Sequence, residues 1–268
     1  SRVQFLSKDL ILVRILKDFL KEKDPNYFVS KNPYAKKKSE YDGMFRFYDQ
    51  KQTFAYGLLP SVIKFLEEED IEYDLQLLDQ YKIDVSNLDF SSNFIGEERA
   101  YQRDAIKAII GERNGIIKIP PRGGKTYTLA EAMRLLIEIY AKKGKKEFRG
   151  LFVVDTDDLF YQAKRDFSVV LKCDESEIGE IKESAFDVKA ITIATIQTLQ
   201  SILRPKVKKE GIDFRKHLLN SYYESLDFLA ADEIQGFITD GRLKCLPQNT
   251  YFRIGMSGTP GDTKFEKF

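Results

Sequence analysis

The sequence predicts an α/β protein in which a large domain, built on a parallel sheet with helices on both faces, follows a small α+β unit. After residue 99, short and almost wholly apolar runs alternate with helical segments, as in sheets buried on both faces. The first 80 residues carry amphipathic helical stretches and a segment of alternating residues instead. A polar, poorly periodic stretch lies between them. We therefore expect a small domain at 1–80, a linker at 81–98 and the larger domain at 99–268.

Periodicity and turn residues place the elements of the small unit. In chain order they are a helix at 8–23, a hairpin at 44–57, a helix at 58–70 and a final strand at 71–79. Ser7 is the expected cap of the first helix, and Asp24-Pro25 is its expected stop. The hairpin is expected to reverse at 49–52.

The larger domain is expected to contain five strands separated by helices. They are GIIKIP (115–120), GLFVVD (150–155), AITIAT (190–195), DFLAAD (227–232) and YFRIGMSG (251–258). The first strand leads through PPRGGKT into a predicted helix at 127–143. This order of strand, glycine-rich turn and helix is the context that a phosphate-binding loop requires.

Composition excludes several classes of chemistry. The chain has 268 residues and a net charge of +1, so overall charge argues neither for nor against a polyanionic partner. The single histidine, His217, is expected on a solvated helix and leaves no basis for a Ser-His-Asp hydrolase or a histidine-rich metal site. Cys173 and Cys245 lack CxxC spacing and are expected to be reduced. No apolar run reaches the ~20 residues that span a bilayer, so no membrane partner is expected.

The turn PPRGGKT is the central chemical motif. Gly123 and Gly124 would let the backbone approach ATP phosphates closely, and Lys125 and Thr126 would bind the phosphates and Mg²⁺. The remaining positions in this nucleotide-binding turn are Pro121 and Arg122. Ile119 stands where such loops usually open with a glycine, and Arg122 is placed to cover an empty phosphate site.

A pair of acids at a later strand end supports this interpretation. Asp232 and Glu233 follow the apolar run FLAA, and adjacent acids on an extended strand diverge. One carboxylate would then bind Mg²⁺, and the other would act on the attacking water. Downstream, Ser257 and Thr259 are hydroxyl residues able to relay hydrogen bonds from the phosphate site.

In order, these segments resemble the motifs of superfamily 2 helicases. The matching motifs are R-x-Y-Q from Arg99 to Gln102, PPRGGKT, DEIQ in place of DEAH or DEAD, and SGTP. The resemblance implies a RecA-like domain of a P-loop NTPase. Its implied roles are adenine recognition by Gln102, γ-phosphate sensing by Gln235, coupling by Ser257 and Thr259, and nucleic-acid backbone contacts by Thr156, Thr195 and Gln197. Asp155 departs from the pattern, because that position is usually proline.

The N-terminal segment YDGMFRFYDQKQTFAYGLL resembles the accessory domain of UvsW-type phage DNA helicases. The resemblance implies branched or partly single-stranded DNA as partner, in recombination, repair or replication. Cations interleaved with aromatic residues suit such a strand; the candidates are Lys36, Lys37, Lys38 and Arg46. The alternative is a solvated basic loop beside buried aromatic residues. The implied location is cytoplasmic, in the host cell if a phage encodes the chain.

The chain ends at Phe268, before the second RecA-like domain that the resemblance implies. That domain carries the arginine fingers, so we expect this chain alone to bind ATP weakly and hydrolyse it slowly. Two other functions stay open. One is a restriction-type ATP-dependent translocase subunit. The other is a DNA-binding module with a vestigial nucleotide loop, which Ile119 and Arg122 favour.

Overall fold

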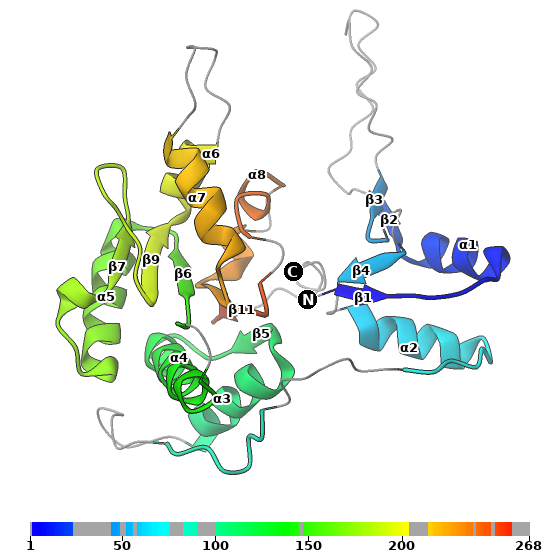
Figure 1. Ribbon diagram of the computed structural model, residues 1–268, viewed down its shortest axis with the longest axis horizontal. Coiled ribbons are helices and arrows are strands. Elements are labelled where there is room, and N and C mark those ends of the chain that lie inside the picture. Colours follow the sequence, from blue (N-terminus) through cyan, green and yellow to red (C-terminus); the bar gives the residue numbers. More distant parts are fainter. Residues whose placement is uncertain are drawn as a thin grey trace, which may run out of the picture. The chain divides into compact units, whose positions relative to one another are not determined.

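The computed structural model divides the chain into two compact units, Ser1–Leu77 and Leu78–Phe268 (Figure 1). The residues that the structure describes are 2–23, 44–48, 52–55, 58–75, 83–90, 100–144, 147–203, 214–237, 240–247 and 250–258. Among these, no helix is long and apolar enough to cross a membrane.

The first unit packs two helices against two small antiparallel strand pairs. The helices are α1 (Leu10–Phe19) and α2 (Leu59–Glu68). Strand β1 (Arg2–Gln4) pairs with β4 (Thr53–Ala55), and β2 (Lys21–Lys23) pairs with β3 (Met44–Arg46). The core joins both helices to β4 through Leu16, Phe54 and Val62. The Phe19 and Phe65 rings stack with centroids 4.3 Å apart.

Three expectations for this unit are corrected. Asp9, not Ser7, caps α1, because its carboxylate accepts from the backbone N–H of Ile11 at 2.8 Å and of Leu12 at 3.3 Å. The helix ends at Phe19 because the next residues form β2. Residues 71–75 form no strand; four of these five residues are exposed and have no ladder partner among the described residues.

The expected hairpin at 44–57 is supported in part, and its arms also have other strand partners. Its two arms, β3 and β4, each pair with a strand from the N-terminal segment, β2 and β1 respectively. Within the described residues of this segment, an antiparallel bridge between Tyr48 and Phe54 joins the arms directly, on either side of the expected reversal. The alternation of apolar and polar residues correctly predicted extended strands at β3 and β4. It carries no information on which other strands they pair with.

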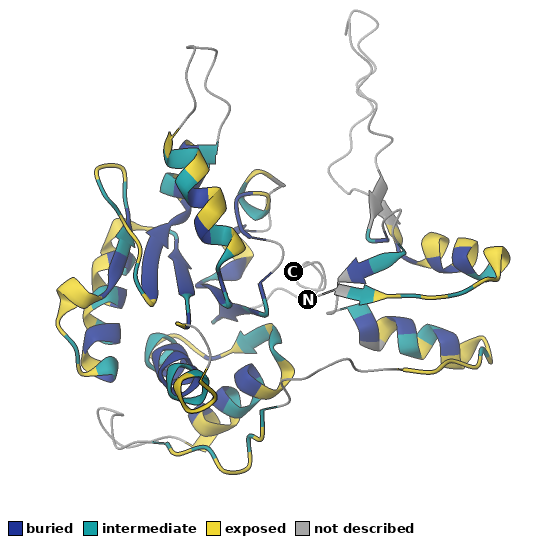
Figure 2. Ribbon diagram, viewed as in Figure 1, coloured by how far each residue is buried: buried dark blue, intermediate teal, exposed yellow. Residues whose placement is uncertain are grey.

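The second unit contains a seven-stranded sheet in the order β5-β11-β10-β6-β9-β7-β8. Its strands are β5 (Asn114–Lys118), β6 (Gly150–Val154), β7 (Gly179–Ile181), β8 (Phe186–Asp187), β9 (Ile191–Thr195), β10 (Phe228–Ala231) and β11 (Phe252–Ser257). All neighbours are parallel except β7 and β8. The five strands predicted from sequence are present, and β6, β9 and β10 are buried along their whole length (Figure 2).

Helices cover both faces of this sheet, and each face has its own core. On one face lie α3 (Ala100–Glu112), α4 (Lys125–Lys142) and α5 (Asp157–Leu171). On the other lie α6 (Ile196–Leu203), α7 (Phe214–Glu224) and the short α8 (Asp240–Leu243). Short 3₁₀ turns follow α5 (Glu175–Glu177) and β10 (Ile234–Phe237).

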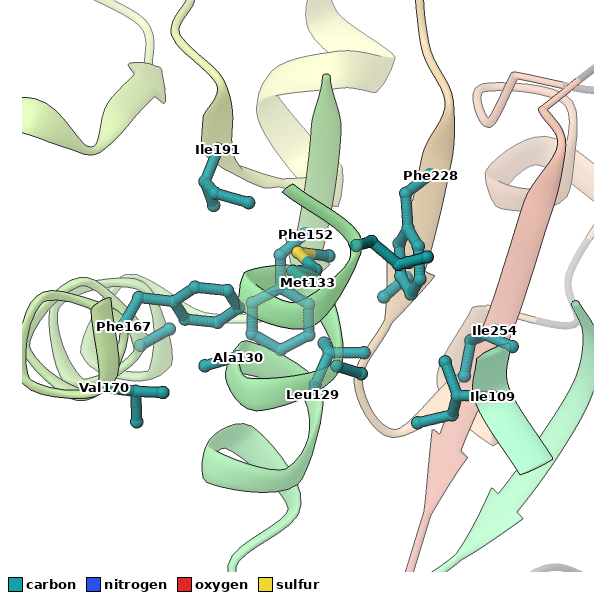
Figure 3. Packing of buried hydrophobic residues seen from close by; sticks show 14 of the residues in the cluster. Ile109, Leu129, Ala130, Met133, Phe152, Phe167, Val170, Ile191, Phe228 and Ile254 are labelled. Carbon is teal, nitrogen blue, oxygen red and sulfur yellow. The ribbon is translucent and has the colours of Figure 1, made fainter. Parts of the chain in front are cut away.

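Aromatic and aliphatic side chains pack together in the first of these cores. Met133 and Leu129 of α4 lie between Phe152 of β6 and Phe228 of β10 (Figure 3). The Phe152 and Phe167 rings, from β6 and α5, have centroids 5.5 Å apart. This packing fixes α4, and with it the loop that precedes it, against the sheet.

Part of the predicted linker belongs to the second unit. Residues 83–90 lay their apolar side chains on the α3–α4 face, with Val85, Leu88 and Phe90 against the core. Arg134 of α4 donates to the Asp89 carbonyl at 3.1 Å. The packing of residues 83–90 was not predicted from the sequence, because the segment has neither helical nor strand periodicity.

Candidate active site

The turn between β5 and α4, which we call the phosphate loop (residues 119–126), is shaped to hold an anion. Arg122 and Gly124 both have positive φ, 61° and 78°. The Gly123 N–H donates to the Pro120 carbonyl at 2.9 Å and closes the turn. Helix α4 begins at Lys125 with no side chain capping it. Its first backbone N–H groups are therefore available for a phosphate.

Both glycines of the loop are required by close contacts. A Cβ on Gly123 would lie 2.5 Å from Ile119 Cγ2 and 2.8 Å from the Pro120 carbonyl oxygen. A Cβ on Gly124 would lie 2.5 Å from Gln102 Nε2. These distances are too short for any side chain, so the loop geometry itself dictates the Gly-Gly pair.

Ile119 is accommodated because it belongs to the core and not to the loop surface. Its side chain is only 2% exposed, and its N–H donates to the Ser257 carbonyl at 3.1 Å, in line with the β5–β11 ladder. The missing first glycine is therefore compatible with a formed loop. Arg122 is exposed.

Two residues of α3 donate hydrogen bonds to the backbone of the phosphate loop. The Tyr101 hydroxyl donates to the Gly123 carbonyl at 2.8 Å, and Gln102 Nε2 donates to the same oxygen at 3.1 Å. Gln102 is buried, so its amide positions the loop; its predicted contact with adenine stays a prediction. Tyr101 belongs to the R-x-Y-Q motif, but no role was predicted for it. Arg99 lies outside the described residues.

The predicted acids meet the loop lysine. Lys125 Nζ hydrogen-bonds Glu233 Oε1 and lies 3.5 Å from Asp232 Oδ1. The Lys125 and Asp232 side chains are 12% and 10% exposed. In sheet order β11 alone separates β5 from β10, so the carboxyl ends of these parallel strands bring the three side chains together.

The pKa values of the Asp232 and Glu233 carboxyl groups are shifted in opposite directions. Burial raises the pKa of Asp232 above its usual value, against the opposing attraction of Lys125. Burial also acts on Glu233, but hydrogen bonds from Lys125 and Gln235 outweigh it and lower the pKa of that carboxyl. Glu233 also has φ of 46°, a left-handed conformation unusual for this residue type.

A chain of side-chain hydrogen bonds leads away from Glu233. Gln235 Nε2 donates to Glu233, and the Ser257 hydroxyl donates to Gln235 Oε1 at 2.8 Å. Ser257 is fully buried at the end of β11. Its predicted partner in coupling, Thr259, lies outside the described residues.

The residues present fit a magnesium ion bound together with a nucleotide. Mg²⁺ is commonly held by one or two carboxylates plus substrate phosphates and water. Asp232 supplies a buried carboxylate, and Thr126 lies in the first turn of α4 beside Lys125. Within the described ranges, no group of three or more His, Cys, Asp or Glu residues forms a metal site by itself.

A pocket, which we call the strand groove, lies at the carboxyl ends of β6 and β9. Its volume is about 480 Å³, and it is lined by Asp155, Thr156, Asp157, Lys182, Glu183, Ser184, Thr195, Gln197 and Thr198. The three predicted backbone-binding residues, Thr156, Thr195 and Gln197, are all in this lining. The structure therefore brings them together in one site.

Each of these three residues has a local partner. Thr156 caps α5 by accepting from the Leu159 N–H at 3.3 Å. The Thr195 and Thr198 hydroxyls lie 2.9 Å apart. Gln197 Nε2 donates to Asp155 Oδ1 at 2.9 Å.

Arg242 of α8, which was not singled out from the sequence, contacts one residue of the groove lining. Its Nη1 lies 3.0 Å from Asp155 Oδ1 and donates to the Gly236 carbonyl at 2.9 Å. Of the predicted basic cluster, Lys36, Lys37 and Lys38 lie outside the described residues, as does the Arg46 side chain.

This geometry defines a class of protein. A glycine loop between a strand and a helix, opposite two acids at the end of a nearby parallel strand, is the arrangement typical of P-loop ATPases with a RecA-like sheet. Residues 95–262 match the family described as "Type III restriction enzyme, res subunit". The chain belongs to this family, whose fold is that of superfamily 2 helicase-like ATPases. A search of curated proteins finds no match.

Two solved structures share the fold of the whole chain. "The crystal structure of T4 UvsW" matches with a TM-score of 0.72 and 19% identity, covering 97% of this chain and 51% of that one. "Crystal structure of the UvsW helicase from Bacteriophage T4" gives a TM-score of 0.71 and 19% identity, with 100% and 93% covered. The predicted UvsW-type fold is thereby confirmed. The chain spans about half the length of the first structure.

Proposed function

We propose that the chain is the ATP-binding part of a DNA helicase or translocase that remodels branched DNA in recombination, repair or replication. The observation that carries this proposal is the convergence of Lys125 with Asp232 and Glu233. Lys125 is a half-buried cation between two carboxylates, and a nucleotide phosphate could replace the carboxylates as its partner. A vestigial loop would have no need to retain all three groups.

Phosphate binding would rearrange this network. The N–H groups at the start of α4 and the Lys125 ammonium would bind the phosphates. The hydrogen bond from Lys125 to Glu233 would then break, and the Glu233 carboxylate would become free to orient and deprotonate the attacking water. Gln235 would continue to donate its hydrogen bond to Glu233. Mg²⁺, held by Thr126 and Asp232, would neutralise charge on the phosphate oxygens.

The hydrogen-bond chain gives hydrolysis a route to the rest of the sheet. A change in Gln235 on contact with the γ-phosphate would be transmitted to Ser257 through the hydrogen bond of 2.8 Å that the Ser257 hydroxyl donates to Gln235 Oε1. In the strand groove, Thr156, Thr195 and Gln197 would contact the DNA backbone. Closure and reopening against a second RecA-like domain would move the strand. The free cysteines suit a reducing compartment, and we expect a cytoplasmic location, in the host cell if a phage encodes the chain.

Calorimetric titration with Mg·ATP, with and without a branched DNA, tests the proposal. We expect Lys125→Ala to abolish nucleotide binding. Glu233→Gln should keep binding but slow hydrolysis, where hydrolysis is measurable, by about 10²–10⁴-fold. Equal ATP affinity in the wild type and Lys125→Ala would contradict a working phosphate loop and favour a DNA-binding module.

The family match favours a second candidate, a restriction-type ATP-dependent translocase subunit. It would use the same ATP site, but DNA cleavage would need a nuclease centre. The part of the chain that the structure describes holds no acidic metal cluster for one. Mg²⁺-dependent nicking of supercoiled DNA by the purified chain would favour this candidate over a helicase.

A further inference from the structure

The strand groove carries a charge pattern that opposes its proposed ligand. Its lining contains three carboxylates, Asp155, Asp157 and Glu183, and a single lysine, Lys182. A phosphodiester strand brings further negative charge to such a surface. The groove must therefore expose additional cationic character before it binds a strand well.

Arg242, which lies outside the lining itself, pairs with the Asp155 carboxylate of the lining. The Asp155 carboxylate takes Arg242 Nη1 at 3.0 Å and Gln197 Nε2 at 2.9 Å on the same oxygen. Two donors that converge on one anionic oxygen form the kind of pocket that a phosphate oxygen fits. The Gly236 carbonyl, 2.9 Å from Nη1, helps to aim the guanidinium at this point.

The pair is open enough to exchange partners. The Arg242 and Asp155 side chains are 26% and 37% exposed, so neither is locked in the core. Asp155 does not cap α5, because Thr156 does. The carboxylate can therefore turn toward solvent without loss of a helix cap.

We propose that Asp155 is an internal competitor of the nucleic-acid backbone, and that Arg242 with Gln197 is the phosphate-binding point that it occupies in the free protein. This inference rests on the proposed function of the groove. A backbone phosphate would replace the carboxylate at Arg242 and Gln197 as the strand enters. Asp155 thereby limits strand affinity, and Arg242 is a strand-binding residue.

The test is fluorescence anisotropy of a labelled oligothymidylate at several salt concentrations. Asp155→Asn should bind about fivefold tighter than wild type, the size of effect of a partly exposed ion pair. Its log–log salt slope should match that of wild type, because a phosphate replaces the carboxylate in both proteins. Arg242→Gln should bind more weakly and with a slope shallower by about 0.7, the loss of one phosphate contact on a single strand. Glu183→Gln is the matched control: it removes one groove carboxylate that has no contact with Arg242, and it should tighten binding much less than Asp155→Asn does.

A double-mutant cycle separates this account from simple charge repulsion. Asp155→Asn should strengthen binding much less in the Arg242→Gln background, because the phosphate-binding point is then gone. Equal gains in both backgrounds, or equal behaviour of Asp155→Asn and Glu183→Gln, would overturn the inference and leave the proposed function standing. No strand binding by wild type or any variant, all folded by circular dichroism, would overturn both.

Discussion

At the residue scale, the phosphate site depends on backbone positions as much as on charged groups. Gly124→Ala places a Cβ at positive φ and 2.5 Å from Gln102 Nε2. We expect a loss of more than about 1 kcal/mol in unfolding free energy, together with loss of Mg·ATP binding. Gly115→Ala is the control, since a Cβ there meets nothing within 4 Å, and should change stability by less than about 0.5 kcal/mol.

Urea unfolding and ATP titration of the two variants measure these effects. The same stability loss in both variants would show that loss of glycine itself, and not the loop geometry, is responsible.

The buried carboxylate of Asp232 predicts a dependence of stability on pH. Its folded-state pKa is raised above the ordinary 3.8, so the folded protein binds this proton more tightly than the unfolded chain does. The corresponding stability is full below pH 3.8 and is lost as pH rises through the folded-state pKa. Asparagine at this position carries no charge at any pH, so Asp232→Asn avoids the cost of burying an ionised carboxylate.

We therefore expect Asp232→Asn to melt higher than wild type at neutral pH without nucleotide, by about 2–4 °C if the difference is about 1 kcal/mol. The gain should shrink as pH falls toward 3.8. Thermal melts from neutral pH into this range measure it; a gain that grows on acidification would contradict the burial argument. Mg·ATP hydrolysis should be lost, as at other sites that exchange stability for function.

At the element scale, α4 carries a buried ion cluster that also fastens residues 83–90. Arg134 pairs with Glu131 through two contacts of 2.7 Å, with Glu138, and with the Asp89 carbonyl. The Glu131 side chain is 1% exposed. Removing Arg134 would leave the negative charge of Glu131 buried and unpaired.

Arg134→Met should therefore destabilise the larger unit by about 3–5 kcal/mol. The double variant with Glu131→Gln should recover much of this loss, because no buried charge remains unpaired. Lys64→Met is the control: it breaks an exposed pair with Glu68 and should cost less than about 1 kcal/mol. Chemical denaturation measures all three. No recovery in the double variant would mean that Arg134 acts through packing instead of charge.

The strands of the sheet were predictable because burial on both faces makes them continuous apolar runs, as in GLFVV of β6 and FLAA of β10. Strands β7 and β8 were not, because three and two residues are too short to show a pattern. Lys125, Asp232 and Glu233 could be placed in one site from motif spacing. The Arg242–Asp155 contact could not, since it joins a side chain of α8 to one in the turn after β6 and depends on packing alone.

At the scale of the whole molecule, the two units are expected to respond differently to nucleotide. A ligand that binds only the folded state stabilises it by about 2.7 kcal/mol at 100 times its dissociation constant. If the phosphate loop binds Mg·ATP, the slowest amides of β6, β9 and β10 should gain this protection in hydrogen exchange. Those of α1 and α2 should not, because the chain divides at Leu77. An equal gain in both units would mean that they unfold together.

Arg242 has its two acceptors in different places: Asp155 in the strand groove and the Gly236 carbonyl, one residue beyond Gln235. Any change in Gln235 on nucleotide binding would thus reach a strand-binding side chain directly. Thermodynamic reciprocity requires that the strand alter nucleotide affinity by the same factor. This route also has an upper limit, because one partly exposed ion pair supplies about 1 kcal/mol, or roughly fivefold. Stronger coupling would have to come from contacts made by additional residues.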